Sequence, residues 1–465
     1  MIRKPPMKKR LALGLGLSLS AALPLAAVEA EPSADHHDHC AAHRGDVIFF
    51  HPDGYGLSHW DALRTRFVGP DGRLNWDKLP YTATYTGHLK DQITGTSHGS
   101  ATTHAYGVKV AADSFGLDDE TPITALSGKP MSLMEEAVAA GFSTALIQTG
   151  SLTEPGTAAF VASVPERDHH EAIARQVIES GVDLIFGGGE AALLPRGVAG
   201  HHGVGARRDG LDLIARARAL GYTVVFTRDE LLALPRTTPK VLGVFAHAHT
   251  FNDQSEEALR AAGLPLYVPS APTVAEMTTV ALEILAQREA AADGSRRPVF
   301  MVVEEEGTDN FPNITNAAGS FEAGRRADEA FGVLREFVRD NPRTLLLTAA
   351  DSSAGSKNLG DWRERGPVDA PMDGVDGHGT APFVSAPDRL GNTFPFAVGW
   401  VSRADLAGGL LTRAEGLNAP LVGKLGIVDN TDIYRLMYLT LFGEWLPGGV
   451  GRAPFEACTA EPDQP

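Results

Sequence analysis

The sequence predicts an α/β fold built on a large, mostly parallel central sheet that is flanked by helices. Short apolar, β-branched runs alternate along the chain with segments of helical periodicity, and this alternation is typical of such a sheet. Acidic residues follow directly after several of the strand-like runs. No repeat of fixed period and no long low-complexity linker divides the chain, so one large domain is expected.

The expected strands are short runs rich in valine, isoleucine, leucine and phenylalanine. Runs of this length that are bounded by turn residues are typical of buried strands. In chain order the runs cover residues 46–50, 143–149, 183–187, 222–227, 240–246, 298–306, 343–350 and 396–401.

Helices are expected where apolar residues recur at spacings of three and four. These segments are residues 132–141, 169–181, 210–221, 274–293, 319–340 and 431–443. Another helix is expected from Ala101 to Lys109, with Thr96 or Ser97 as its N-cap. The stretch 190–280 is expected to form an elaboration on the edge or top of the sheet.

The first 30 residues have the pattern of an export signal. A basic segment, residues 1–10, precedes an apolar segment, residues 11–27, and small residues at Val28 and Ala30 offer a cleavage site. The apolar run is too short and too rich in glycine and serine for a typical membrane span, and an uncleaved anchor is the alternative. We therefore expect a signal peptide over 1–30, a tail over 31–44 and a catalytic domain over 45–460 in a secreted or periplasmic protein.

The charge of the chain limits its partners. The formal net charge is −17, and residues 1–30 carry five Lys or Arg and one Glu, so their removal leaves −21. An acidic protein of this kind is not expected to bind nucleic acid or anionic membranes non-specifically. No stable membrane association is expected after cleavage of the signal.

Cys40 and Cys458 are the two cysteines of the chain. They stand near the two ends of the expected mature protein, and neither lies in a CxxC or other metal-binding spacing. An even pair in an exported protein predicts one disulfide between the termini, and two free thiols are the alternative.

Carboxylates cluster after the expected strands. Ligands of open α/β sheets bind beyond the carboxyl ends of the strands, and carboxylates crowded there repel one another unless cations neutralise them. Taken alone, each has a structural explanation as a turn, a solvated charge run or a helix cap. Together they predict a metal cluster formed by Asp53, Glu154, Glu304, Glu305, Glu306, Asp309 and Asp351.

With these residues in view, the chain resembles the alkaline phosphatase family over nearly all of residues 45–445. The longest match is residues 132–195, which place Arg167 at the position of the phosphate-binding arginine. The segment TSHGSATTHAYGVK resembles the nucleophile segment and places Ser97 at the nucleophile position. The other matching segments are HPDGYG, VVEEEGTDN, LLLTAADSSAGS and DGHGTAPFVSAP.

The resemblance implies a three-layer fold and a secreted, metal-dependent phosphomonoesterase that acts through a phosphoserine at Ser97. Small phosphate monoesters and inorganic phosphate would be its ligands, Arg167 would bind two phosphate oxygens, and a homodimer is left open. Ser97 would stand at a helix N-terminus, which favours an anion. The nearby hydroxyls of Thr96, Ser100 and Thr102 fit the pattern less well.

By the same resemblance, seven residues are implied as metal ligands. The family uses magnesium and zinc, but the chain departs from its pattern at Thr96, Gly156 and Ser352, and it has Asn313 where a histidine is usual. The remaining ligand set is mainly oxygen, which favours calcium, magnesium or manganese over zinc. The implied ligands are Asp53, Glu154, Glu304, Asp309, Asn313, Asp351 and His378.

Other histidines are less promising candidates. His247 and His249 follow a strand but fall outside the ligand positions that the resemblance implies. His98 and His104 flank the expected nucleophile, and the sequence does not give their direction. The remaining group, in the expected tail, consists of His36, His37 and His39.

Two alternatives to a phosphomonoesterase stay open at this point. The same site could serve a phosphodiesterase or a sulfatase, or the chain could be a non-catalytic relative that binds phosphate or metal. Retention of Ser97 and Arg167 together with the carboxylates argues against loss of activity, and an arginine suits a dianionic phosphate.

Overall fold

The computed structural model describes residues 44–287, 297–361, 374 and 382–448. These residues all belong to one compact unit. In the described part of the chain, no helix has the length and apolar character needed to cross a membrane.

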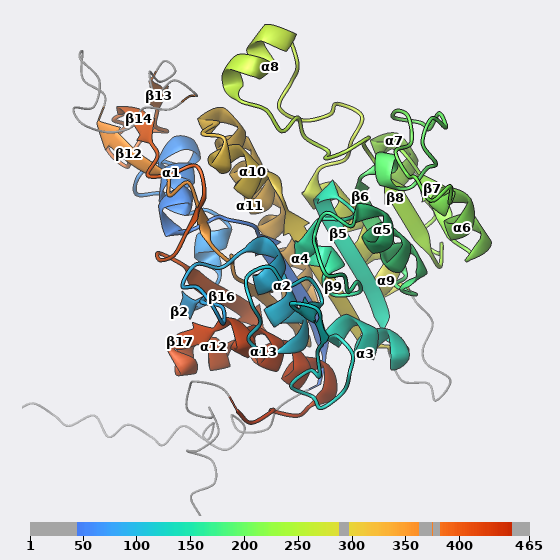
Figure 1. Ribbon diagram of the computed structural model, residues 1–465. Coiled ribbons are helices and arrows are strands. Elements are labelled where there is room, and N and C mark those ends of the chain that lie inside the picture. The colour runs from blue at the N-terminus through green and yellow to red at the C-terminus, as the bar shows by residue number, and fades with distance from the viewer. Residues whose placement is uncertain (1–43, 288–296, 362–373, 375–381, 449–465) are drawn as a thin grey trace, which may run out of the picture. The chain divides into compact units, whose positions relative to one another are not determined.

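A ten-stranded sheet forms the centre of this unit (Figure 1). Seven neighbouring strands run parallel. In spatial order they are β10 (Thr344–Thr348), β1 (Asp46–Pro52), β9 (Val299–Glu305), β5 (Ser143–Ser151), β6 (Leu184–Gly188), β8 (Val241–Val244) and β7 (Thr223–Val225).

Three further strands extend the sheet beyond β10. They are β16 (Leu411–Gly416), β2 (Tyr81–Thr86) and β17 (Ile427–Asp429). Strand β16 pairs antiparallel with both of its neighbours, and β17 pairs parallel with β2. The expected large, mostly parallel sheet is therefore confirmed.

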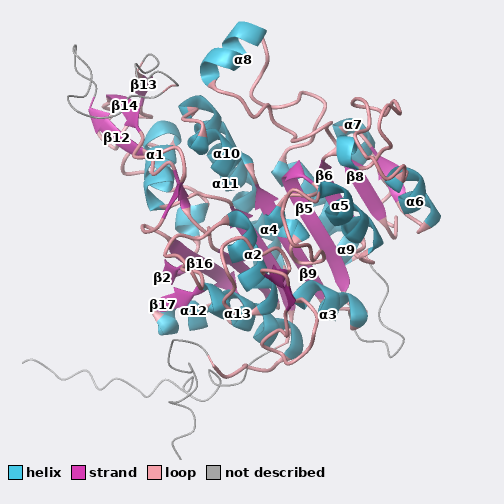
Figure 2. Ribbon diagram, viewed as in Figure 1, coloured by secondary structure: helices cyan, strands magenta, loops and turns pink. Residues whose placement is uncertain are grey.

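Helices cover both faces of the sheet because its central strands are apolar on both sides (Figure 2). In β1, Val47 and Phe49 face one layer, while Ile48 and Phe50 face the other. Burial of each such side chain contributes about 1.5–3 kcal/mol.

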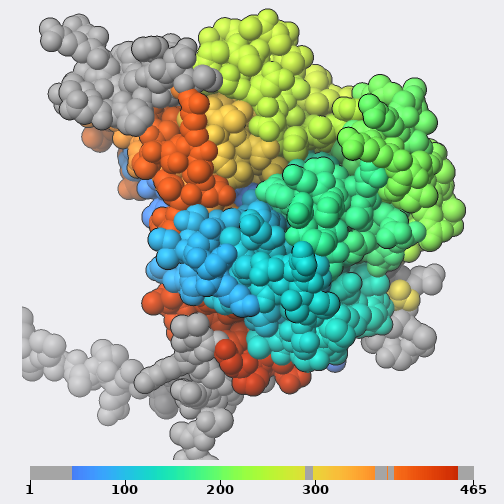
Figure 3. Space-filling view, viewed as in Figure 1, coloured from blue at the N-terminus to red at the C-terminus, as the bar shows by residue number. Residues whose placement is uncertain are grey.

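The first layer packs on the face of Val47 and Phe49. It contains α2 (Ser97–Tyr106), α3 (Leu133–Ala139), α4 (Pro155–Ala158), α5 (His170–Glu179), α6 (Leu213–Ala219), α12 (Pro420–Leu425) and α13 (Asn430–Phe442). In the space-filling view of Figure 3, the blue to green segments of the chain form the middle and the right of the face that is shown.

The second layer packs on the face of Ile48 and Phe50. It contains α1 (Leu57–Phe67), α7 (Arg228–Leu232), α9 (Val274–Ala286) and α11 (Ala317–Asp340). Helix α11 begins at the cap of Asn316, whose side chain accepts a hydrogen bond from the Gly319 amide.

Shorter elements lie outside these layers. They include α8 (Glu256–Ala262), α10 (Gly307–Asn313), and the 3₁₀ turns η1 (Trp76–Lys78) and η2 (Glu190–Ala192). Three small sheets are also present. The first contains β12 (Asn358–Asp361), β14 (Pro395–Gly399) and β13 (Phe383–Val384). The second pairs β11 (Ser353–Ala354) with β15 (Asp405–Leu406), and the third pairs β3 (Leu117–Asp118) with β4 (Thr121–Pro122).

Each of the eight expected strands is present, with small differences in its bounds. Strand β1 extends two residues beyond the expected run and includes His51 and Pro52. The run at 396–401 forms β14, which belongs to the three-stranded sheet and not to the central one. The expected helix near Ala101 begins earlier, at Ser97. Sequence periodicity did not reveal α1, β2, β16 or β17.

Candidate active site

Four adjacent strands of the sheet lead to one group of buried carboxylates. The strands β10, β1, β9 and β5 are neighbours, and the chain continues from their carboxyl ends into Asp351, Asp53, the Glu304–Glu306 segment and Glu154. Ligand atoms of Asp53, Glu304 and Glu306 lie within 4.8 Å of one another, as do those of His51, Asp53 and Asp351. The two groups share Asp53.

Ser97 is the first residue of helix α2 and lies beside Asp53. Thr96 is the N-cap, because its hydroxyl accepts a hydrogen bond from the Gly99 amide at 3.1 Å and donates one to the Ala112 carbonyl at 2.7 Å. The Ser97 side chain is therefore not used for capping. Its hydroxyl lies close enough to Asp53 to help lower the pKa of that carboxyl.

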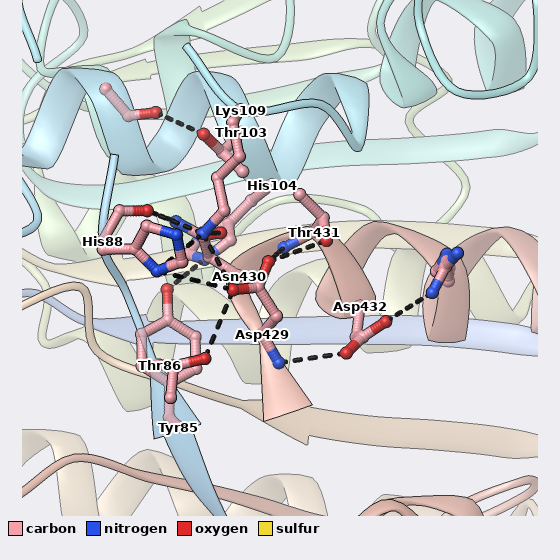
Figure 4. A network of polar contacts seen from close by, with 12 residues as sticks. Tyr85, Thr86, His88, Thr103, His104, Lys109, Asp429, Asn430, Thr431 and Asp432 are labelled. Atoms are coloured by element: carbon pink, nitrogen blue, oxygen red, sulfur yellow. Dashed lines mark hydrogen bonds and ion pairs between the residues drawn. The ribbon is translucent and has the colours of Figure 1, made fainter. Parts of the chain in front are cut away.

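Contacts at the far end of α2 hold this helix in place (Figure 4). The His104 Nε2 atom is 2.8 Å from the Tyr85 hydroxyl on β2. Just after the helix, the Lys109 ammonium donates to Asp429 at 2.8 Å and to Asn430 at 2.6 Å. His104 and Lys109 thus anchor the helix that carries Ser97.

Arg167 approaches the carboxylates from the exposed side. Its Nη2 atom donates a hydrogen bond to Glu154 Oε2 at 3.0 Å, and its side chain is 42% exposed. Burial opposes its charge, but the nearby carboxylates of Glu154 and Glu306 raise the pKa of Arg167. In this chain Glu154 supplies the carboxylate that contacts Arg167. Thr96, which precedes Ser97, has a hydroxyl and no carboxylate.

A third polar group contains Asp309, Asn313 and Asp405. The Asn313 Nδ2 atom donates to both Asp309 oxygens at 3.0 Å and to Asp405 Oδ1 at 3.1 Å. Asp405 reaches this group because β15 pairs with β11, where Asp405 stands opposite Ala354. The sequence analysis did not single out Asp405, although the expected strand over residues 396–401 ends shortly before it.

Gly156 leaves space for the Glu304 side chain. A Cβ atom at position 156 would lie 1.7 Å from Glu304 Oε1, which is far inside van der Waals contact. The Glu304 carboxylate therefore occupies the volume that a larger residue at 156 would need. This coupling gives a physical reason for glycine at one of the positions where the chain departs from the expected pattern.

The carboxylates carry more negative charge than the surrounding residues can balance. Burial, together with the charge of Asp53, raises the pKa of Glu304 to about 8, and burial raises the pKa values of Glu306, Asp309 and Asp351 well above their ordinary range. Burial also opposes ionisation of Asp53, but the hydrogen bond with His51 lowers the pKa of Asp53 to about 2.

Several buried oxygens of these residues also lack a hydrogen-bond partner among the described residues. Unpaired buried carboxylate oxygens are costly, and oxygen atoms converging at this spacing are the ligands of divalent cations. The donor set therefore fits divalent metal ions. The unpaired atoms are Asp53 Oδ2, Glu304 Oε1 and Oε2, Glu306 Oε2, Asn313 Oδ1 and Asp351 Oδ2.

The structure adds His51, which the sequence analysis did not single out, to one of the two metal-like groups. It also places Glu306, a member of the expected metal cluster that the resemblance did not imply as a ligand, in the other group. Glu306 belonged to the acidic run at 304–306, but the sequence could not tell which of its side chains turn inward. Glu305 Oε1 accepts hydrogen bonds from Thr149 at 2.9 Å and from Tyr267 at 2.8 Å, so this oxygen is engaged in hydrogen bonds within the protein.

Some candidate residues lie outside the described part of the chain. They are His378, the three histidines His36, His37 and His39, and both cysteines, Cys40 and Cys458. Their expected roles stay predictions.

The other histidines occupy different surroundings. His98 is buried, and its Nε2 atom is 3.6 Å from Asp113 Oδ1. His247 and His249 line a cavity of about 700 Å³ that Glu154 borders on one side. Further residues of that cavity are His169, His170 and Arg208, so it is rich in cationic and titratable groups.

Comparisons with known proteins point to one family. The family model described as alkaline phosphatase matches residues 44–388. Among curated proteins, the alkaline phosphatase of Escherichia fergusonii is 26% identical over 352 residues, which cover 67% of this chain and 70% of that protein. The streptomycin-6-phosphate phosphatase of Streptomyces griseus is 26% identical over 384 residues, covering 76% and 82%.

A solved structure agrees in fold. The alkaline phosphatase of Thermus thermophilus superposes with a TM-score of 0.66 at 22% identity, over 89% of this chain and 96% of that one.

Proposed function

The chain belongs to the alkaline phosphatase family, and on that premise we propose that it hydrolyses phosphate monoesters through a phosphoserine at Ser97. The relatives support a phosphatase or phosphoesterase function. The serine route rests chiefly on one observation, the position of Ser97 at the start of α2, next to Asp53 and the buried carboxylates.

Ser97 is suited to attack a bound phosphate. It stands at the N-terminus of a ten-residue helix, where free backbone N–H groups and the helix dipole favour an anion. Its Oγ atom would bond to phosphorus as the bond from phosphorus to the substrate oxygen breaks, and the alcohol would leave with a proton. Water would then hydrolyse the phosphoserine to inorganic phosphate and restore the hydroxyl.

Arg167 would hold the phosphate dianion in place. A guanidinium binds phosphate oxygens through charge-assisted hydrogen bonds, often through two of its N–H groups. Glu154 accepts a hydrogen bond from Nη2, which orients the guanidinium toward the carboxylate-lined site. An arginine held in this way suits the two negative charges of a monoester better than the single charge of a diester or sulfate ester.

Family membership and the buried carboxylates support the use of divalent metal ions. The residues that would hold them are Asp53 with Asp351, Asp53 with Glu304 and Glu306, and Asp309 with Asn313 and Asp405. When bound, such ions would make a hydroxyl more nucleophilic and stabilise the charge on a leaving oxygen. Glu154 and His378 stay proposed ligands from the resemblance.

The test compares Ser97→Ala with a matched control, Ser100→Ala, on the same helix. Ser100 is also buried, and neither change removes the Thr96 cap. Hydrolysis of an aryl phosphate should fall on the order of 10³-fold or more in Ser97→Ala and stay near normal in the control. Mass spectrometry of the acid-quenched wild-type enzyme should locate phosphate on the peptide that contains Ser97.

Three outcomes would contradict the proposal. The first is near-normal activity of folded Ser97→Ala protein, and the second is equal loss in both variants. The third is faster turnover of an aryl sulfate or an aryl phosphodiester than of the monoester, which would assign the site to another esterase class.

We also propose that the protein is exported, as the first 30 residues predict. N-terminal sequencing of the mature protein should begin after Ala30. A mature protein that begins at Met1 would contradict cleavage.

A further inference from the structure

Strand β1 places an imidazole among the buried carboxylates. We propose that His51 is a metal ligand, which together with Asp53 and Asp351 binds a divalent transition metal such as zinc. The metal site formed by His51, Asp53 and Asp351 therefore contains one nitrogen ligand. The neighbouring group, formed by Asp53, Glu304 and Glu306, offers only oxygen ligands. The inference extends the proposed metal use, but it does not depend on which ester is hydrolysed.

The hydrogen bond on the far side of the ring orients His51 for this role. Its Nδ1 atom lies 2.9 Å from the Ala349 carbonyl oxygen, which can only accept a hydrogen bond. Nδ1 therefore carries the hydrogen, and Nε2 points toward the carboxylates, 3.2 Å from Asp53 Oδ1. Histidines that bind metals typically donate their second ring N–H to a carbonyl or carboxylate in this way.

The sheet register brings His51 to the same face as Glu304. His51 on β1 stands opposite Glu304 on β9, and residues paired across a sheet point to the same side. This is the face on which α2 and Ser97 pack. His51 is 1% exposed, and ligand atoms of His51, Asp53 and Asp351 lie within 4.8 Å of one another.

Unpaired oxygens give independent support for a cation at this position. Asp53 Oδ2 and Asp351 Oδ2 are buried and have no hydrogen-bond partner among the described residues. One imidazole can hydrogen-bond only one of these carboxylates, and in the structure that partner is Asp53. A metal ion bound by all three side chains would satisfy them together.

Two other buried histidines show what a purely structural imidazole looks like in this protein. His59 on α1 makes a hydrogen bond with the Ala354 carbonyl at 2.9 Å, and no described ion pair links it to a carboxylate. His104 is held by the Tyr85 hydroxyl. His51 differs from both because its second ring nitrogen faces a carboxylate group.

The chemistry of the ligands then separates the two neighbouring positions. Zinc and related transition metals favour imidazole nitrogen, whereas magnesium and calcium favour oxygen alone. Removal of His51 should therefore weaken zinc binding much more than magnesium binding. A merely structural role would lower both affinities together, or neither.

The experiment compares full-length mature wild-type protein with His51→Gln and His59→Gln. Each protein is stripped with a chelator and titrated calorimetrically with zinc and, separately, with magnesium, after circular dichroism has verified its fold. In His51→Gln the affinity of one zinc site should fall by about tenfold or more, so that this site no longer binds zinc tightly. Magnesium affinity should change less than threefold, and His59→Gln should match the wild type with both ions.

A second measurement does not require the His51 variant to fold. Zinc-loaded His378→Gln protein lacks the imidazole that the resemblance implies as a metal ligand. If His51 also binds zinc, X-ray absorption at the zinc edge should still show imidazole scattering. A spectrum fitted by oxygen ligands alone would overturn the proposal. Unchanged zinc affinity in folded His51→Gln, or equal zinc losses in both glutamine variants, would overturn it as well. Wild-type protein that binds zinc through His51 yet hydrolyses no phosphate ester would contradict the proposed function alone.

Discussion

Glu154 and Arg167 are joined by a hydrogen bond of 3.0 Å between Oε2 and Nη2. Glu154 precedes the short helix α4 at the end of β5, and Arg167 comes from the loop that leads to α5. The pair connects the expected phosphate-binding arginine to the carboxylate group. Thr96, where the chain departs from the family pattern, supplies no carboxylate to this arginine.

The first prediction concerns this pair. Arg167→Ala should raise the inhibition constant of inorganic phosphate and the KM of an aryl phosphate by about 10- to 150-fold, the equivalent of a lost charge-assisted hydrogen bond of about 1.5–3 kcal/mol. Glu154→Gln should have a smaller effect, since the arginine remains. Steady-state kinetics with phosphate as inhibitor measure both.

Arg216→Ala is the matched control, because Arg216 pairs with Glu179 at 2.8 Å on the exposed surface. It should leave both constants unchanged. Unchanged phosphate inhibition in Arg167→Ala would remove this residue from the site. A fall in magnesium affinity in Glu154→Gln would show that Glu154 is also a metal ligand.

The second prediction concerns the identity of the metals. The group formed by Asp53, Glu304 and Glu306 offers only oxygen, so it should select magnesium, calcium or manganese. Chelator-stripped protein should regain activity only when one of these ions is supplied, with or without zinc. Separate titrations with elemental analysis of the reactivated protein test this. Full activity restored by stoichiometric zinc, with the other three ions inert, would contradict it.

The third prediction concerns pH and the stability of the metal-free protein. Burial raises the pKa of Glu304 from its ordinary value of 4.5 to about 8, and that of Glu305 to about 7. Between about pH 5 and pH 8 the folded state keeps protons that the unfolded chain releases, so the free energy of unfolding should fall as pH rises.

His51 acts in the same direction. Burial opposes its charge, but Asp53 raises the pKa of His51 from its ordinary value of 6.5 to about 10, so its stabilising contribution falls as pH rises between these two values. Asp53, whose pKa is lowered to about 2, contributes evenly throughout this window. Thermal melts of chelator-stripped protein at pH 5.5 and pH 8 should show a lower Tm at pH 8, and added magnesium should remove most of that difference. A higher Tm at pH 8 without metal would contradict the assignment.

The fourth prediction concerns Gly156. In Gly156→Ala the new Cβ atom must displace the Glu304 carboxylate, which should cost about 1–3 kcal/mol of stability and weaken magnesium binding. Gly423→Ala is the control, because Gly423 lies within α12 and a Cβ atom there meets nothing closer than 3.6 Å. Replacing a helical glycine should make that variant equal or more stable by about 0.5–1 kcal/mol. Denaturant unfolding gives the free energy of unfolding of both variants. Equal values would show that the Glu304 side chain moves aside without loss of stability.

The fifth prediction concerns Cys40 and Cys458, which lie outside the described residues. They should form one intramolecular disulfide in the exported protein. Alkylation of the unreduced, denatured protein followed by mass spectrometry should find no free thiol. Two modified cysteines would show that the termini are not linked.

The sequence by itself determined the fold class and many of the candidate residues. Alternating apolar runs and helical periodicities are local patterns, and they marked the strands that lead to Asp53, Glu304 and Asp351. The motif around Ser97 was equally local, although only the structure shows that Thr96 caps the helix, so that the Ser97 hydroxyl near Asp53 is not used for capping.

Tertiary structure decided which of these residues meet. The order β10-β1-β9-β5 is not the order of the chain, and the packing of helices on both faces fixes it. That order sets His51 opposite Glu304, and a two-residue pairing of β11 with β15 brings Asp405 to Asn313. Such contacts join residues that are far apart in sequence. They depend on which strands become neighbours, and that is a property of the whole fold which no local pattern carries.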